Sequence, residues 1–104
     1  MELNMHYKNI QDATKAKAKE RVEEKLQDAL KQFGSFEETD AVDANAHLEY
    51  FEKHNEFTVR VQLRVHKKGK EYSFVVEKKK KDDLLGCVDD MKLALHEMIR
   101  KEKE

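Results

Sequence analysis

Hydrophobic and polar residues alternate in four segments of the chain, with the period of two that is typical of half-buried strands. The first segment has its apolar positions at Leu3, Met5 and Tyr7, and the others cover residues 42–50, 57–66 and 72–76. Lys67-Lys68-Gly69-Lys70 separates the last two segments, and we interpret it as a tight hairpin turn in which Gly69 adopts a positive φ. Because each segment has one apolar face, we predict a sheet that is covered on one side only.

Two further segments show the three- and four-residue spacing of amphipathic helices. The first runs from Asp12, the expected N-cap, to Gly34, the expected C-cap, and residues 34–41 after it form an acidic, polar loop. Its apolar stripe comprises Ala18, Val22, Leu26, Ala29 or Leu30, and Phe33. The second helix begins after Asp82 or Asp83, and we expect its tail at residues 100–104 to fray. Its inward positions are Leu84, Leu85, Val88, Met91, Leu95 and Met98 or Ile99.

The order of elements is therefore β-α-β-β-β-α. A strand–helix–strand unit crosses over with a right hand, which brings both helices to the same face of the sheet. We predict an α+β fold in which two helices pack on one face of a four-stranded sheet. The 104 residues suffice for one domain, so we expect residues 1–104 to form a single domain.

Charge is abundant and strongly segregated. Charged residues make up 41% of the chain, although the formal net charge is only −1. Residues 59–81 carry nine basic and two acidic side chains, whereas residues 34–58 carry one basic and seven acidic ones. The segregation is consistent with a basic face for an anionic partner. It is equally consistent with neighbouring strands of opposite charge that neutralise each other, and both interpretations stay open at this stage.

The sequence favours a cytoplasmic protein. It contains no stretch near the roughly 18 consecutive apolar residues of a membrane span, and we expect no membrane partner. Its first residues lack the basic and then apolar pattern of a signal peptide. Cys87 is the single cysteine, so an internal disulfide is impossible and a reducing compartment is expected.

No pattern of catalytic residues is present. The three glycines are isolated and cannot build a phosphate-binding loop, and the five histidines show no metal-ligand spacing. His47 and Glu49 could share a strand face as ligands, but an exposed ion-pairing couple is the more common outcome. Cys87 lies among inward positions of the second helix, which favours a buried thiol over a nucleophile. We therefore predict that the protein is not an enzyme and uses no metal, cofactor or small-molecule substrate.

Basic residues are the remaining candidates for function. Lys17, Arg21 and Lys25 form an i, i+4, i+8 stripe on the first helix, and we expect it to face solvent. A run of four lysines, Lys78–Lys81, leads into the second helix. Such side chains neutralise phosphates without reading bases, and few aromatic residues are available to stack on bases. A structured RNA recognised through its phosphates fits best. Ordinary solvated faces are the alternative, since Glu20, Glu23 and Glu24 interrupt the helical stripe.

Several motifs resemble one known family. Met1-Glu2-Leu3-Asn4-Met5 is similar to its first strand, and Val22, Lys25, Leu26 and Phe33 have the spacing of its first helix. Asp83-Leu84-Leu85-Gly86-Cys87-Val88-Asp89 is similar to the pattern Asp-Met/Leu-Tyr-Ala-Ala-Ile-Asp at the start of its second helix. The family comprises the short ribosome hibernation-promoting factors, also called ribosomal subunit interface, ribosome-associated inhibitor or sigma-54 modulation proteins. The resemblance extends over essentially the whole chain.

The resemblance implies a protein that lies in the mRNA and tRNA channel of the small ribosomal subunit and holds ribosomes idle without catalysis. Longer members carry a second, dimerising domain, which we expect this chain to lack. The residues that we expect to contact ribosomal RNA are Lys17, Arg21, Lys25, Lys78, Lys79, Lys80, Lys81, Arg100, Lys101 and Lys103, of which Lys101 and Lys103 match basic positions of the family's tail.

Some positions depart from the family pattern. The family's second helix continues as Lys-Leu-x-x-Gln, where this chain has Ala94-Leu95-His96-Glu97-Met98, and a lysine of the first helix is replaced by Asp28. The resemblance therefore supports the fold more strongly than the function. The alternative function is a protein–protein interaction module of the same fold, which would use the acidic residues 34–58 and the uncovered face of the sheet.

Overall fold

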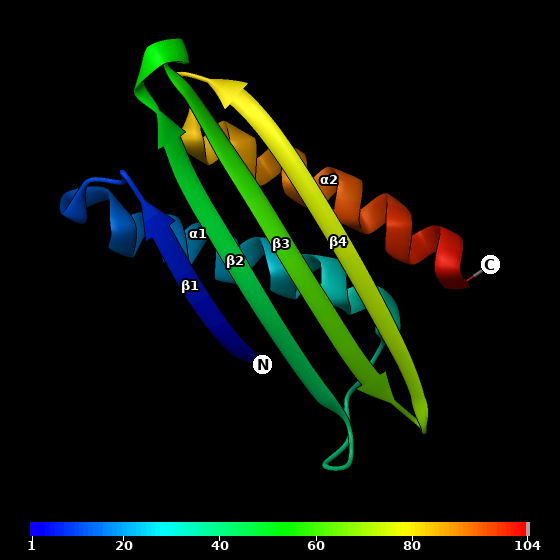
Figure 1. Ribbon diagram of the computed structural model, residues 1–104. Coiled ribbons are helices and arrows are strands. Elements are labelled where there is room, and N and C mark those ends of the chain that lie inside the picture. The colour runs from blue at the N-terminus through cyan, green and yellow to red at the C-terminus, as the bar shows by residue number, and fades with distance from the viewer. Residues whose placement is uncertain (104) are drawn as a thin grey trace.

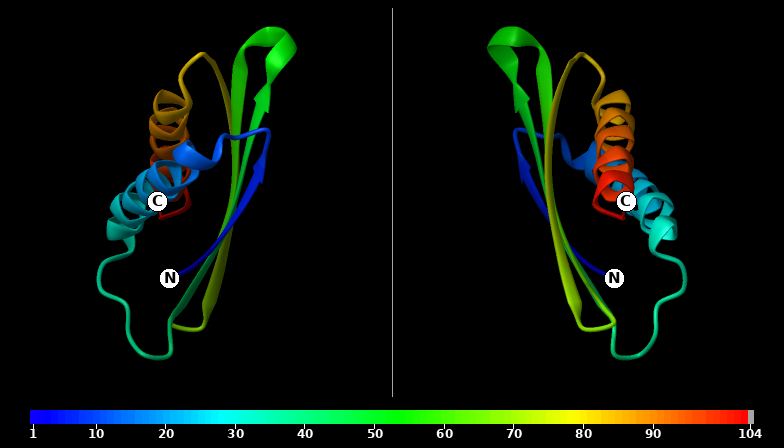
Figure 2. Two further views of the ribbon diagram at one scale, coloured as in Figure 1. Left: turned by 90° about the vertical axis from the view of Figure 1, so that its left-hand side faces the viewer. Right: turned by 90° about the vertical axis from the view of Figure 1, so that its right-hand side faces the viewer.

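The computed structural model describes residues 1–103, in which a four-stranded sheet carries both long helices on one face (Figures 1 and 2). The elements are β1 (Glu2–Lys8), α1 (Asp12–Leu30), β2 (Ala41–Phe51), β3 (Glu56–Lys67), β4 (Lys70–Lys81) and α2 (Leu84–Lys103). Short 3₁₀ helices, Lys31–Phe33 and Glu52–His54, follow α1 and β2. The predicted α+β class and the order β-α-β-β-β-α are confirmed.

The strands are arranged in sequence order, so β1 and β4 form the two edges of the sheet. β1 pairs with β2 in parallel, and the other two pairs are antiparallel. Since α1 follows β1 and α2 follows β4, both helices run in the same direction across the sheet (Figure 1). No helix within residues 1–103 has the length and apolar character needed to cross a bilayer.

The core lies between the sheet and the helices, as the alternation of the strands predicts. Leu26 of α1, Val61 of β3, Phe74 of β4 and Leu95 of α2 are all at most 4% exposed. Ile99 rather than Met98 is the last inward residue of α2, because Met98 is 38% exposed. The other face of the sheet carries the polar half of each alternating pattern and is not covered by any described element (Figure 2).

The ends of the helices differ in part from the prediction. Asp12 is the first residue of α1 rather than its cap; Gln11 precedes the helix without a side-chain capping bond, and Asp12 pairs with Lys15 at 2.8 Å. Gly34 adopts a φ of 75° and ends the 3₁₀ turn after α1. Asp83 caps α2, since its Oδ1 accepts a hydrogen bond from the Gly86 N–H at 2.8 Å. Residues 100–103, which we expected to fray, are helical, and Glu104 lies outside the described residues.

The lysine run is also placed differently. Lys78–Lys81 does not form a loop before α2 but the last third of β4, where Lys78 pairs with Val59 and Lys80 with Phe57 of β3. The hairpin between β3 and β4 has the predicted position. Both Lys68 and Gly69 have positive φ, 52° and 78°, which matches the two left-handed residues of a type I′ turn.

The acidic loop and the basic hairpin meet at one end of the molecule. The carboxylate of Asp40 accepts hydrogen bonds from the backbone N–H groups of Glu37 at 2.8 Å and Lys68 at 3.1 Å. Lys67 lies 3.9 Å from the same carboxylate, and the Asp40 side chain is only 2% exposed. The bond from Glu37 is the main reason that the pKa of Asp40 lies below its usual value. At this contact, negative charge of the acidic loop and positive charge of the hairpin neutralise each other.

Candidate nucleic-acid interface

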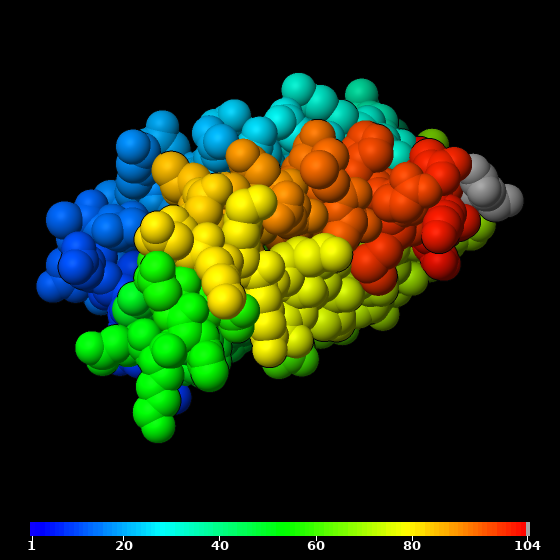
Figure 3. Space-filling model, turned by 90° about the horizontal axis from the view of Figure 1, so that it is seen from above, coloured from blue at the N-terminus to red at the C-terminus, as the bar shows by residue number. Residues whose placement is uncertain are grey.

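The first group of predicted basic residues lies along the seam between the two helices. In Figure 3, α1, α2 and the end of β4 lie side by side on one face of the molecule. The Nε and Nη2 of Arg21 donate hydrogen bonds of 3.0 and 2.9 Å to the two carboxylate oxygens of Asp89 on α2. Lys25 Nζ lies 3.8 Å from the same carboxylate. Further along the seam, Gln32 donates a hydrogen bond of 2.9 Å to the His96 carbonyl oxygen.

The expected solvent-exposed stripe is therefore wrong in part. Lys17 is exposed and makes no ion pair with any residue from 1 to 103, but the side chain of Lys25 is only 21% exposed. The hydrogen bond with Arg21 lowers the pKa of Asp89, and the same contact raises the pKa of Arg21. Arg21 and Lys25 thus bridge α1 and α2 as well as carrying charge.

The second group, Lys78–Lys81, is divided between two faces because side chains alternate along a strand. Lys80 lies on the helix side and pairs with Asp90 of α2 at 3.3 Å. Lys79 and Lys81 lie on the opposite, uncovered side of the sheet. Lys78, Lys79 and Lys81 are exposed, and no acidic side chain in residues 1–103 pairs with them. The run therefore forms a basic edge on β4 rather than one flat patch.

The third group lies at the end of α2. Arg100 pairs with Glu97 one turn earlier, and Lys101 is exposed. Lys103 Nζ donates a hydrogen bond to the Gln32 carbonyl oxygen and lies 5.5 Å from the centre of the Phe33 ring. Lys103 thus packs against the 3₁₀ helix that follows α1. The ten predicted residues therefore form three groups, in the helix seam, on the β4 edge and at the end of α2.

The uncovered face of the sheet contains contacts that the sequence pattern did not reveal. The rings of His6 on β1 and His47 on β2 stack with centroids 4.4 Å apart and an interplanar angle of 11°. Beside them, Lys8 and Glu49 form an ion pair at 3.5 Å. Burial lowers the pKa of His47, and the neighbouring His6 lowers it further. Among residues 1–103, no three His, Cys, Asp or Glu side chains are grouped so that they could hold a metal ion.

Cys87 is buried, as predicted. Its Sγ donates a hydrogen bond to the Lys78 carbonyl oxygen at 3.2 Å. Burial raises the pKa of the thiol to about 11, so the thiolate that a nucleophile needs is rare at neutral pH.

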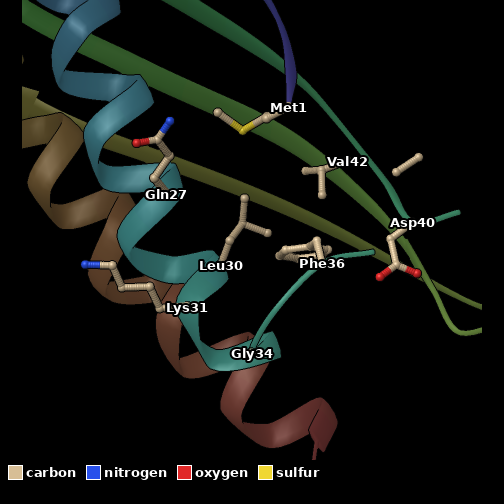
Figure 4. A pocket seen from close by; sticks show the side chains of 9 residues that line it. Met1, Gln27, Leu30, Lys31, Gly34, Phe36, Asp40 and Val42 are labelled. Carbon is tan, nitrogen blue, oxygen red and sulfur yellow. The ribbon is translucent and has the colours of Figure 1, made fainter. Parts of the chain in front are cut away.

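A cavity of about 360 Å³ lies at the C-terminal end of α1, apart from the basic groups. Met1, Leu30, Phe36 and Val42 form its apolar walls, and the Lys31 ammonium points away from it (Figure 4). The Asp40 carboxylate at its rim is already engaged by two backbone N–H groups. The walls of the cavity are therefore mostly apolar.

Residues 3–104 match the model of the family described as sigma 54 modulation protein / S30EA ribosomal protein. No curated protein matches the sequence at a significant level. One similar solved structure is the N-terminal domain of Protein Y from Thermus thermophilus, with 18% identity and a TM-score of 0.65 over 97% of this chain and 98% of that one. Another is a ribosomal subunit interface protein from Coxiella burnetii, with 16% identity and a TM-score of 0.64 over 99% of this chain and 98% of that one. At these identities, the two structures support the fold alone.

Proposed function

Because the chain belongs to the sigma 54 modulation protein / S30EA ribosomal protein family, we propose that it binds the small ribosomal subunit and holds ribosomes in an idle state. The family match over residues 3–104 is the observation that carries this proposal. The solved structure from Coxiella burnetii with the same fold is named as a ribosomal subunit interface protein, which agrees with it. We propose a cytoplasmic location together with this function.

The chemistry of the surface is suited to ribosomal RNA. Lysine and arginine side chains bind phosphate oxygens as charged donors and do not read the bases. Among the ten predicted residues, the strongest candidates are the exposed lysines that make no ion pair within residues 1–103, because they have no acidic partner to give up; they are Lys17, Lys78, Lys79, Lys81 and Lys101. Arg21, Lys25, Lys80, Arg100 and Lys103 lie beside them and extend the same groups.

In this proposal the protein acts by occupying a site on the ribosome and not by catalysing a reaction. A folded domain that lies in the mRNA and tRNA channel of the small subunit excludes both ligands while it is bound. Contacts to phosphates make such binding reversible and strongly dependent on salt, since each neutralised phosphate releases counterions. No covalent step is required, so the protein acts without a catalytic residue or cofactor.

Co-sedimentation with purified small ribosomal subunits on sucrose gradients tests the proposal. We expect the protein to migrate with the subunits at low salt and to be released as the salt concentration rises. Lys17→Glu should weaken the association, whereas Lys19→Glu is the matched control on the same helix. If the wild-type protein stays at the top of a low-salt gradient that contains excess subunits, the proposal is wrong. Capture of a protein partner that resists salt would favour the interaction module instead.

A further inference from the structure

One carboxylate on α2 binds two cations of α1. Asp89 accepts both hydrogen bonds from the Arg21 guanidinium, and Lys25 Nζ approaches the same Oδ1 to 3.8 Å. The Asp89 side chain is 38% exposed and that of Arg21 is 36% exposed, so the contact lies at the surface of the seam. A molecule that approaches this face can reach both groups.

This arrangement has the geometry of an anion site. Guanidinium groups bind carboxylates and phosphates through the same pair of parallel N–H donors. Arg21 directs Nε and one terminal nitrogen towards Asp89, and a lysine ammonium completes the site from the next turn of the helix. Asp89 thus occupies the position that a phosphate oxygen would take between these two cations.

Other acidic groups reduce the positive charge of the same surface. Lys17 and Arg21 share a small hollow with Glu20 and Glu24, which are their neighbours on α1. The negative charges of Glu24 and Asp83 also act on Arg21 and help to raise its pKa. The seam therefore holds three cations but has little net positive charge while Asp89 is bound to two of them.

We propose that Asp89 is an internal competitor of the RNA: its carboxylate holds Arg21 and Lys25 in the free protein, and a ribosomal RNA phosphate displaces it on binding. This inference rests on the proposed function and adds a residue that limits affinity. A purely positioning role for Asp89 predicts the opposite change in RNA affinity when the charge of Asp89 is removed. If Asp89 only oriented Arg21 towards the RNA, removal of its charge would weaken binding.

Asp89→Asn tests the inference, because the amide keeps the shape of the side chain and removes its charge. We expect Asp89→Asn to bind purified small subunits about fivefold more tightly at low salt, which corresponds to the loss of one unit charge about 4 Å from the binding groups in water. Asp89→Glu keeps the charge and should bind like the wild type.

Two controls separate a local effect from a change in net charge. Glu71→Gln removes the carboxylate of another arginine pair, which joins Glu71 to Arg64 at 2.8 Å on the uncovered face of the sheet, and should leave affinity unchanged. In an Arg21→Gln/Lys25→Gln background, Asp89→Asn should no longer increase affinity, because its two partners are gone. Thermal melting of each variant checks that it is folded.

The outcomes are distinct. If the wild type binds but Asp89→Asn binds equally or more weakly while remaining folded, the competitor role is wrong and the proposed function stands. If Glu71→Gln increased the affinity for small subunits by the same factor, the effect would come from the change in net charge, and the inference would also be overturned. Failure of the wild type to bind small subunits would remove the proposed function and this inference with it.

Discussion

The capping carboxylate of Asp83 lies where a side chain on Gly86 would have to be. A Cβ added to Gly86 would come within 2.1 Å of Asp83 Oδ2, whereas Oδ1 accepts the hydrogen bond from the Gly86 N–H. The absence of a side chain at position 86 therefore allows the carboxylate to fold over the first turn of α2. The two residues act as one unit at the start of this helix.

This contact predicts non-additive effects on stability. Asp83→Ala should lower the free energy of unfolding by about 1 kcal/mol through the loss of the cap. Gly86→Ala should raise it by about 1 kcal/mol in the Asp83→Ala background, where only helix propensity changes. In the wild-type background the gain should be smaller, since the new methyl group displaces the capping carboxylate. Urea denaturation of the wild type, the two single variants and the double variant gives the four free energies of unfolding. Strictly additive effects of the two substitutions would contradict the contact.

Two leucines of α2 provide a matched test of its orientation. Leu95 is 1% exposed, whereas Leu93 is 63% exposed on the same helix. Leu95→Ala should cost about 2–5 kcal/mol because it removes buried methyl groups and leaves a cavity. Leu93→Ala should change the free energy of unfolding by less than about 0.5 kcal/mol. Similar destabilisation by both changes would overturn the packing of α2 against the sheet.

The buried thiol predicts a loss of stability at alkaline pH. Burial raises the pKa of Cys87 to about 11 in the folded protein, while the unfolded chain ionises near its ordinary value of 9.0. Between these values the unfolded state has lost a proton that the folded state keeps. The free energy of unfolding should therefore fall with rising pH, with a slope of at most about 1.4 kcal/mol per pH unit from this group.

Cys87→Ala isolates this effect, because the variant lacks the thiol and should show a shallower decline between pH 9 and 11. Urea denaturation at each pH gives the comparison. In the native state at pH 7.5, a thiol reagent should label Cys87 far more slowly than it labels the unfolded chain. Identical alkaline slopes in the two proteins, or rapid native-state labelling, would argue against a buried thiol.

Charge reversals on α1 should separate binding from stability. Arg21→Glu places a second carboxylate against Asp89, so it should lower the melting temperature as well as RNA affinity. Lys17→Glu changes an exposed residue that has no ion pair in residues 1–103 and should lower affinity alone. Thermal melting at two salt concentrations gives the measurement, and added salt should reduce the difference between the variants. Equal melting temperatures at low salt would show that the Arg21–Asp89 pair does not hold the helices together.

The layers of the fold follow from the sequence pattern. Alternation in residues such as Val61 and Phe74 decides which face of each strand is apolar, and the stripe through Leu26 decides which side of α1 is buried. These are local properties, because side-chain direction follows directly from the period of the secondary structure. The motif from Asp83 to Asp89 likewise indicated the start of α2 and the family.

The pairing of charged side chains between elements depends on the tertiary structure. Arg21 and Asp89 are 68 residues apart, and no local pattern relates a position on α1 to one on α2. The end of β4 was hidden for a related reason: Lys78–Lys81 has no apolar alternation, and its pairing with Phe57 and Val59 of β3 extends the strand. Backbone hydrogen bonds between strands do not depend on side-chain polarity, so a run of lysines can complete a strand that its own pattern does not predict. The same pairing sends alternate lysines to opposite faces, which divides one basic motif of the sequence between two surfaces of the protein.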